Sequence, residues 1–192
     1  MSSTFNSKTK KSIVISVLTV LIVIFVFPTT NTKLKRKLNK NAQLSAKYDR
    51  FKAEGFQKEF RLPKERLEAV IDTAMTFLGV PNRVGGVDRD SIDASGLLYV
   101  SINKNFDVKF PRIAQDMARY GKIITDTQNL KRGDLVFFFD TYEVDRIITS
   151  VGLYLGENKF INSSTNEGVS VSEIDDPYYW KNKFFFGTRI FK

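Results

Sequence analysis

The order of helix-like and strand-like segments constrains the fold of this 192-residue chain more than any other feature. Before Gly133, apolar residues recur at helical spacing, whereas after it short runs of β-branched and aromatic residues alternate with turn residues. The runs that we expect to form strands are residues 134–139, 151–155, 159–161, 169–171 and 184–191. Helices followed by a meander of strands are typical of an α+β domain, here with helices packed on an antiparallel sheet of about five or six strands.

The part of this domain before Gly133 predicts three helices. Residues 63–79 carry an apolar stripe at helical spacing, and Pro63 suits the first turn of that helix. A second helix is expected at residues 94–102, where Asp93 is placed to cap the free N–H groups of the first turn. The third is expected at residues 111–121, from a proline that begins it to a glycine that ends it.

The net charge of +9 belongs to one end of the chain. Residues 1–61 contain 13 Lys and Arg against 3 Asp and Glu, whereas residues 62–192 contain 17 against 18. A basic tail beside an apolar run indicates a membrane surface rather than a nucleic acid. We therefore expect no nucleic-acid partner.

The apolar run begins at Ile13, ends at Phe27 and follows a basic stretch in residues 1–12. At about 1.5 Å per residue it spans roughly 22 Å, less than a ~30 Å hydrocarbon core, and its length suits the apolar region of an export signal. No Ala-x-Ala cleavage site follows it, so residues 13–28 are predicted to be an uncleaved signal or anchor helix. Basic residues on both sides leave the membrane orientation open.

Residues 29–61 resemble a basic amphipathic helix, with apolar residues at helical spacing from Leu34 to about Phe60 and a break expected at Gly55. One interpretation is a juxtamembrane stalk that lies on anionic headgroups; the other is a solvated spacer. The globular domain is then expected at residues 62–192.

The chain contains neither cysteine nor histidine. This composition excludes disulfides, thiolate and imidazole metal sites, a cysteine nucleophile and a histidine general base. Any chemistry must use carboxylates, hydroxyls, Lys, Arg or Tyr, and we expect neither a metal nor a cofactor.

Six short segments occur in an order and spacing that resemble the NlpC-type family of papain-like bacterial cell-wall endopeptidases. They are Leu-Gly-Val-Pro-Asn-Arg-Val-Gly-Gly at residues 78–86, Asp-Ala-Ser-Gly-Leu-Leu at 93–98, Phe-Pro-Arg at 110–112, Leu-Lys-Arg-Gly-Asp-Leu-Val-Phe-Phe at 130–138, Ser-Val-Gly-Leu-Tyr-Leu-Gly at 150–156 and Phe-Ile-Asn-Ser-Ser at 160–164. The resemblance covers roughly residues 65–190. It implies a papain-like fold and an ancestry among enzymes that cleave the stem peptides of peptidoglycan.

The same resemblance implies that the catalytic positions have been substituted. The position of the family's nucleophilic Cys is Ala94, and that of its His base is Ser150. The third catalytic position is Asn162, and the Tyr that helps to stabilise the oxyanion corresponds to Asn82. Alanine has nothing to ionise and serine cannot replace imidazole as a base, so the acyl-enzyme mechanism is lost.

Residues that resemble the family's ligand-binding positions are retained. Asp93 and Ser95 flank the nucleophile position, where the family can recognise the amine end of a stem peptide, and Arg112 follows Pro111. A structural role is the favoured alternative for Asp93 and Ser95, because they stand where a helix needs a cap and a first-turn residue.

The sequence thus predicts an exported, membrane-anchored NlpC-like pseudoenzyme of the bacterial envelope that binds stem peptide or a protein partner. One alternative is a weak hydrolase that uses Ser95 or a carboxylate. The carboxylates considered are Asp88, Asp90, Asp93, Asp140, Glu143 and Asp145. The other alternative is a structural envelope protein whose groove is filled by Phe137, Phe138 and Phe139.

Overall fold

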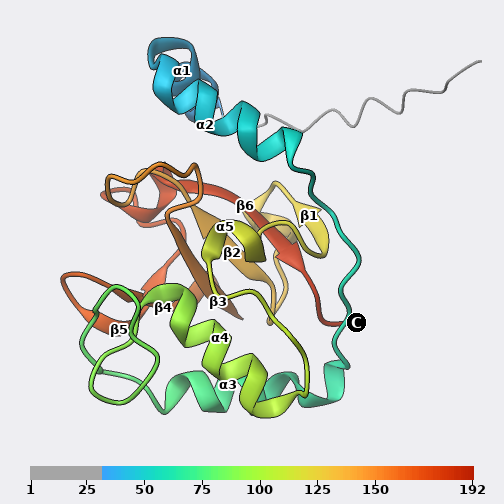
Figure 1. Ribbon diagram of the computed structural model, residues 1–192. Coiled ribbons are helices and arrows are strands. Elements are labelled where there is room, and N and C mark those ends of the chain that lie inside the picture. Colours follow the sequence, from blue (N-terminus) through green and yellow to red (C-terminus); the bar gives the residue numbers. More distant parts are fainter. Residues whose placement is uncertain (1–31) are drawn as a thin grey trace, which may run out of the picture.

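The computed structural model describes residues 32–192 (Figure 1). The basic region at residues 1–12 and the apolar helix expected at residues 13–28 lie outside the described residues. Within residues 32–192, no helix combines the length and apolar character needed to cross a membrane.

The centre of the domain is a six-stranded antiparallel sheet with strand order β1-β6-β2-β3-β4-β5. Its strands are β1 (Lys122–Ile124), β2 (Leu135–Phe138), β3 (Ser150–Gly156), β4 (Lys159–Ser164), β5 (Gly168–Glu173) and β6 (Phe184–Arg189). The predicted α+β class, the number of strands and the five predicted strand positions are confirmed. Strand β1 was not predicted.

Both faces of the sheet are covered by apolar side chains, because successive residues of a strand point to opposite faces. Val151 and Leu153 belong to the larger core cluster, together with the helices. Tyr154 belongs to a second cluster on the other face, which Phe138, Phe160 and Trp180 also join. The sheet therefore has little freedom of register, since a slip of one residue would exchange the two faces.

The helices of the main domain precede the sheet in the chain. They are η1 (Lys64–Arg66), α3 (Leu67–Met75), α4 (Ala94–Asn105) and α5 (Ala114–Met117), with short 3-10 turns η2 (Thr127–Asn129) and η3 (Trp180–Asn182) among the strands. The first two predicted helices are confirmed. The predicted start of the third helix at Pro111 is wrong, because the chain stays extended at Ile113, which is the N-cap of α5.

The basic segment forms two helices rather than one, α1 (Thr32–Lys40) and α2 (Ala42–Ala53). The Oδ1 atom of Asn41 accepts a hydrogen bond from the N–H of Leu44 at 3.0 Å, so a new helix begins there. Helix α2 ends before Gly55, whose φ of 84° confirms the expected break. Figure 1 shows α1 and α2 at one end of the domain and α3 and α4 at the other.

Helix α2 is part of the folded domain. Phe51 is fully buried against Phe186, with ring centroids 6.2 Å apart, and Tyr48 lies 6.0 Å from Phe185. The buried guanidinium of Arg119 donates to the carbonyl oxygens of Phe51 (3.1 Å) and Gly55 (2.8 Å). These contacts bury the apolar side of α2 in the core of the domain.

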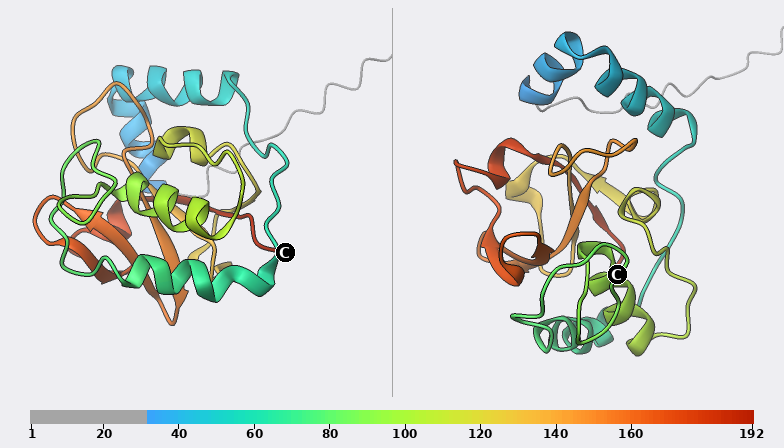
Figure 2. Two further views of the ribbon diagram at one scale, coloured as in Figure 1. Left: turned by 60° about the horizontal axis from the view of Figure 1, so that its bottom comes forward. Right: turned by 60° about the vertical axis from the view of Figure 1, so that its left-hand side comes forward.

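The segment between α2 and η1 follows the outside of the domain and passes the C-terminus (Figure 2). Its backbone is bonded along the way, since Lys58 N–H donates to Arg119 O at 2.8 Å and Leu62 N–H to Ile190 O at 2.8 Å. This pairing ties the segment that follows α2 to the domain.

Candidate functional site

A cleft of about 560 Å³ opens at the N-terminus of α4, and we call it the α4 cleft. Its walls come from five parts of the chain that are distant in sequence. The lining residues are Asn82, Val84, Gly85, Asp93, Ala94, Ser95, Arg112, Ile113, Ala114, Thr141, Tyr142, Arg146, Ile148, Thr149, Ser150, Ser163, Ser164, Thr165, Tyr179 and Trp180. Six of the seven predicted site residues therefore meet in one cleft, and Asn162 is the one that does not line it.

Asp93 begins helix α4 and closes the loop before it. Its Oδ1 atom accepts a hydrogen bond from the N–H of Gly96 at 2.6 Å, which confirms the predicted cap, and its Oδ2 atom accepts from the N–H of Gly85 at 2.7 Å. Ala94 follows as the first residue of α4. Ala94 thus lines the cleft at the place where the helix dipole would favour a thiolate.

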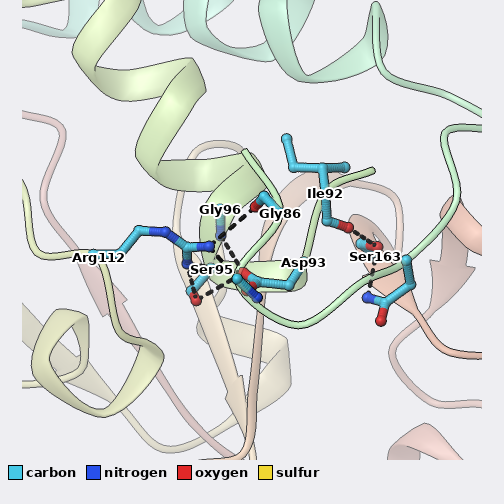
Figure 3. Close-up of polar contacts among 9 residues, drawn as sticks. Gly86, Ile92, Asp93, Ser95, Gly96, Arg112 and Ser163 are labelled. Carbon is cyan, nitrogen blue, oxygen red and sulfur yellow. Dashed lines mark hydrogen bonds and ion pairs between the residues drawn. The ribbon is translucent and has the colours of Figure 1, made fainter. Parts of the chain in front are cut away.

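The guanidinium of Arg112 binds both Asp93 and Ser95 (Figure 3). Its Nη1 and Nη2 atoms lie 2.9 Å from Oδ1 and Oδ2 of Asp93, and Nη1 also donates to Oγ of Ser95 at 2.9 Å. Nη2 donates to Gly86 O at 3.0 Å. The loop that contains Gly86 can lie this close to the first turn of α4 only because Gly96 has no side chain. A Cβ atom on Gly96 would lie 2.3 Å from Gly86 O.

These bonds determine how Asp93 titrates. Burial alone would raise the pKa of Asp93, but the hydrogen bonds from Arg112, Gly96 and Gly85 outweigh it and hold the pKa below its ordinary value. A carboxylate with a lowered pKa is a poor general base. The hydroxyl of Ser95, which donates to Asp93 Oδ1 at 3.1 Å, is therefore not activated as a nucleophile.

Asp93→Asn is expected to destabilise the domain by about 2 kcal/mol at neutral pH, because Arg112 loses its charged partner. A lowered pKa stabilises the fold above the ordinary carboxyl value of 3.8, and this contribution disappears as pH falls through the folded-state pKa. In Asp93→Asn, the free energy of unfolding should no longer show this part of the decrease at acidic pH. Urea unfolding of the natural protein and of Asp93→Asn, at pH 7 and at pH 3, measures the two free energies of unfolding. If the two proteins differed by the same amount at both pH values, the lowered pKa of Asp93 would be contradicted.

The positions that correspond to the family's His and to its orienting residue lie on adjacent strands. Ser150 begins β3, is 6% exposed and borders the cleft. Asn162 on β4 is fully buried, and neither its Oδ1 nor its Nδ2 atom has a hydrogen-bond partner within residues 32–192. Buried amides are nearly always bonded in proteins, so this one stands out.

Asn82 is held in place by β4. Its Nδ2 atom donates to Oγ of Ser163 at 2.9 Å, and that hydroxyl donates to the carbonyl oxygen of Ile92 at 2.7 Å. Figure 3 shows Ser163 beside Ile92, on the far side of Asp93 from Arg112. Asn82 thus fixes the loop before α4 to the sheet.

The carboxylates that the sequence suggested do not assemble into a pair. Of the six, Asp93 alone lines the α4 cleft. The Oδ1 atom of Asp88 accepts from the backbone N–H groups of Asp90 (3.0 Å) and Ser91 (3.1 Å), and Asp145 pairs with Arg50. Among the described residues there is no cluster of acidic side chains that could hold a metal ion.

The phenylalanines suggested as a plug do not enter the cleft. Phe137, Phe138 and Phe139 are fully buried in the core, and none of them lines the cleft. Trp180 and the half-exposed Tyr142 and Tyr179 form part of its wall instead, together with Arg146. Sequence reasoning missed these four residues, because single aromatic or basic residues in loops carry no periodic signal.

The NlpC/P60 family model matches residues 79–189, which is more than half of the chain. The chain belongs to the NlpC/P60 family. It is 31% identical over 121 residues to murein DD-endopeptidase MepS/murein LD-carboxypeptidase of Escherichia coli (strain K12), covering 63% of this chain and 61% of that protein. It is 36% identical over 119 residues to the probable endopeptidase NlpC of the same strain, covering 62% of this chain and 75% of that protein. The chain thus spans about three-fifths of the length of MepS.

Solved structures agree with this assignment. A protein of Staphylococcus aureus subsp. aureus Mu50 described as similar to lipoprotein, NLP/P60 family, matches with a TM-score of 0.60 and 25% identity, over 69% of this chain and 43% of that one. The NlpC/p60 domain of the peptidoglycan hydrolase SagA matches with a TM-score of 0.53 and 20% identity, over 64% of this chain and 97% of that one. The papain-like NlpC/P60 fold expected from the sequence is confirmed.

Proposed function

We propose that this protein is a pseudoenzyme of the bacterial envelope that binds the stem peptide of peptidoglycan in the α4 cleft without cleaving it. The observation that carries the proposal is the pairing of an open cleft with Ala94 at its helix N-terminus and Ser150 on its sheet side. The side chain of Ala94 has no nucleophilic atom, and the hydroxyl of Ser150 cannot act as a general base.

Two polar side chains of the same cleft that could replace the missing groups are already engaged. Ser95 is bonded to Arg112 and to a carboxylate of lowered pKa, and Asn82 is engaged with Ser163. What remains is a set of hydroxyls, backbone groups and aromatic rings around an accessible space, which suits binding of an extended peptide. The relatives named murein endopeptidase and peptidoglycan hydrolase support peptidoglycan as the ligand.

The location at the envelope rests on two further features. The relatives are endopeptidases by name, one of them acting on murein, and the apolar run at residues 13–27 is proposed to anchor the chain in the inner membrane, with the domain outside the cytoplasm. Lys35, Arg36 and Lys40 of α1 are exposed and would lie beside anionic headgroups.

Binding is tested with the full chain in mild detergent, because a fragment that begins at residue 62 would lack the core residues of α2. The protein is incubated with purified peptidoglycan, and both sedimented protein and released muropeptides are measured. We expect co-sedimentation without release. Ala94→Tyr should abolish co-sedimentation by filling the cleft, whereas the matched variant Ala46→Tyr, on an exposed part of α2, should not.

Two results would overturn the proposal. Muropeptide release that Ser95→Ala removes would identify a hydrolase. Absence of both co-sedimentation and release would exclude peptidoglycan as the ligand and leave an envelope protein as the partner to be sought.

A further inference from the structure

We propose that Arg146 anchors a carboxylate of the bound peptide, so that the α4 cleft selects stem peptides in their acidic form over amidated ones. The inference rests on the function proposed above and specifies the chemistry of its ligand. It concerns a residue outside all the positions that the family resemblance identified.

The other arginine of the cleft is already engaged. Both terminal nitrogens of Arg112 are bonded, to Asp93, Ser95 and Gly86, at 2.9 to 3.0 Å. Its charge is balanced by the carboxylate of Asp93. Arg112 therefore holds the N-terminus of α4 and has no free pair of donors for a ligand.

Arg146 is exposed at the cleft, in the loop between β2 and β3. No hydrogen bond or ion pair to its guanidinium is found within residues 32–192. The neighbouring acid, Asp145, binds Arg50 of α2 instead, with Nη1 to Oδ2 at 2.9 Å and Nη2 to Oδ1 at 3.3 Å. The carboxylate of Asp145 lies within electrostatic reach of Arg146, but its hydrogen bonds go to Arg50 and none goes to Arg146.

The same loop is held to α2 at a second point. Lys47 Nζ donates to the carbonyl oxygen of Val144, two residues before Arg146 in the chain. The loop is thus supported by α2, which does not line the cleft. This support places Arg146 in the cleft wall at a lower entropic cost than a free loop would have.

The net charge of the residues that line the α4 cleft determines which ligands are attracted to it. Asp93 and Arg112 cancel, and Arg146 is the other residue of the lining that is charged at neutral pH. The lining therefore carries one net positive charge, on a guanidinium with a planar pair of donors that no described side chain binds. A guanidinium of this kind matches the two oxygens of a carboxylate.

The test compares binding of two synthetic stem peptides to the full chain in mild detergent by calorimetry, at low ionic strength. One peptide has free carboxylates and the other has all carboxylates amidated. We expect the acidic peptide to bind roughly tenfold more tightly to the natural protein, as for one charged hydrogen-bond pair. Arg146→Gln should remove this preference, and Arg146→Lys should keep part of it.

The matched control is Lys131→Gln, which removes an exposed cation at the opposite end of β2, outside the cleft. It should leave the preference unchanged and so exclude a general effect of net charge. Equal binding of both peptides by the natural protein, or an unchanged preference in Arg146→Gln, would overturn the carboxylate anchor alone. Failure of the natural protein to bind either peptide would instead overturn the function on which it rests.

Discussion

Substituting cysteine for Ala94 and histidine for Ser150 in the same chain is expected to produce peptidoglycan endopeptidase activity. Both positions line the α4 cleft, and the cysteine would lie at the N-terminus of α4, where the helix dipole favours the thiolate. Asn162 follows on the adjacent strand with a free buried amide, which is available to orient an imidazole at position 150. We expect activity at least about 100-fold above either single variant, since a general base contributes about 10²–10⁴.

The measurement is release of muropeptides from purified peptidoglycan by the double variant, Ala94→Cys, Ser150→His and the natural protein, all at equal concentration. The natural protein and Ala94→Cys should release little or nothing above background. A double variant that folds, co-sediments with peptidoglycan and still releases nothing would contradict the conclusion that these two positions are what prevents cleavage.

Phe51→Ala is expected to lower the free energy of unfolding by about 3–5 kcal/mol, the usual cost of removing a buried phenylalanine ring. The side chain is fully buried and packs on Phe186, so its loss leaves a cavity between α2 and the sheet. So large an effect would establish that the basic segment belongs to the cooperative folding unit.

Urea unfolding followed by circular dichroism measures this effect. Tyr178→Ala is the matched control, because that ring is 93% exposed and its removal should change the free energy by less than about 0.5 kcal/mol. If Phe51→Ala were as mild as the control, α2 would be an appendage rather than part of the core.

The main elements of the domain could be predicted because they are controlled by local rules. The strands after Gly133 follow from runs of β-branched and aromatic residues, and the start of α4 follows from the position of Asp93 before an apolar segment. Strand β1 has three residues and pairs with one neighbour, β6. So short an element has no period by which a sequence could reveal it.

The burial of α2 could not be predicted for a different reason. Tyr48 and Phe51 are separated and flanked by charged residues, so the pattern is typical of a surface helix. Their burial depends on Phe185 and Phe186, more than 130 residues further along the chain. Packing between elements so far apart in sequence has no local signal.

The candidate site also has a part that the sequence could predict and a part that it could not. The motifs that resemble the family predict that Ala94, Ser150 and Asn82 share one site, and all three line the α4 cleft. The engagement of Arg112 with Asp93 and the unpaired state of Arg146 depend on side chains from separate segments. Those relations arise only from the folded chain, so no spacing in the sequence could indicate them.

The unpartnered amide of Asn162 has a consequence for the history of the protein. A buried amide without a hydrogen bond costs about 1–3 kcal/mol, and an aliphatic side chain of similar size would avoid that cost. If the proposed function is correct, Asn162 remains from an ancestor in which it oriented a histidine at position 150, and that histidine has since been replaced by serine. The protein would then descend from an active hydrolase, and its core would still contain one residue of the ancestral catalytic site.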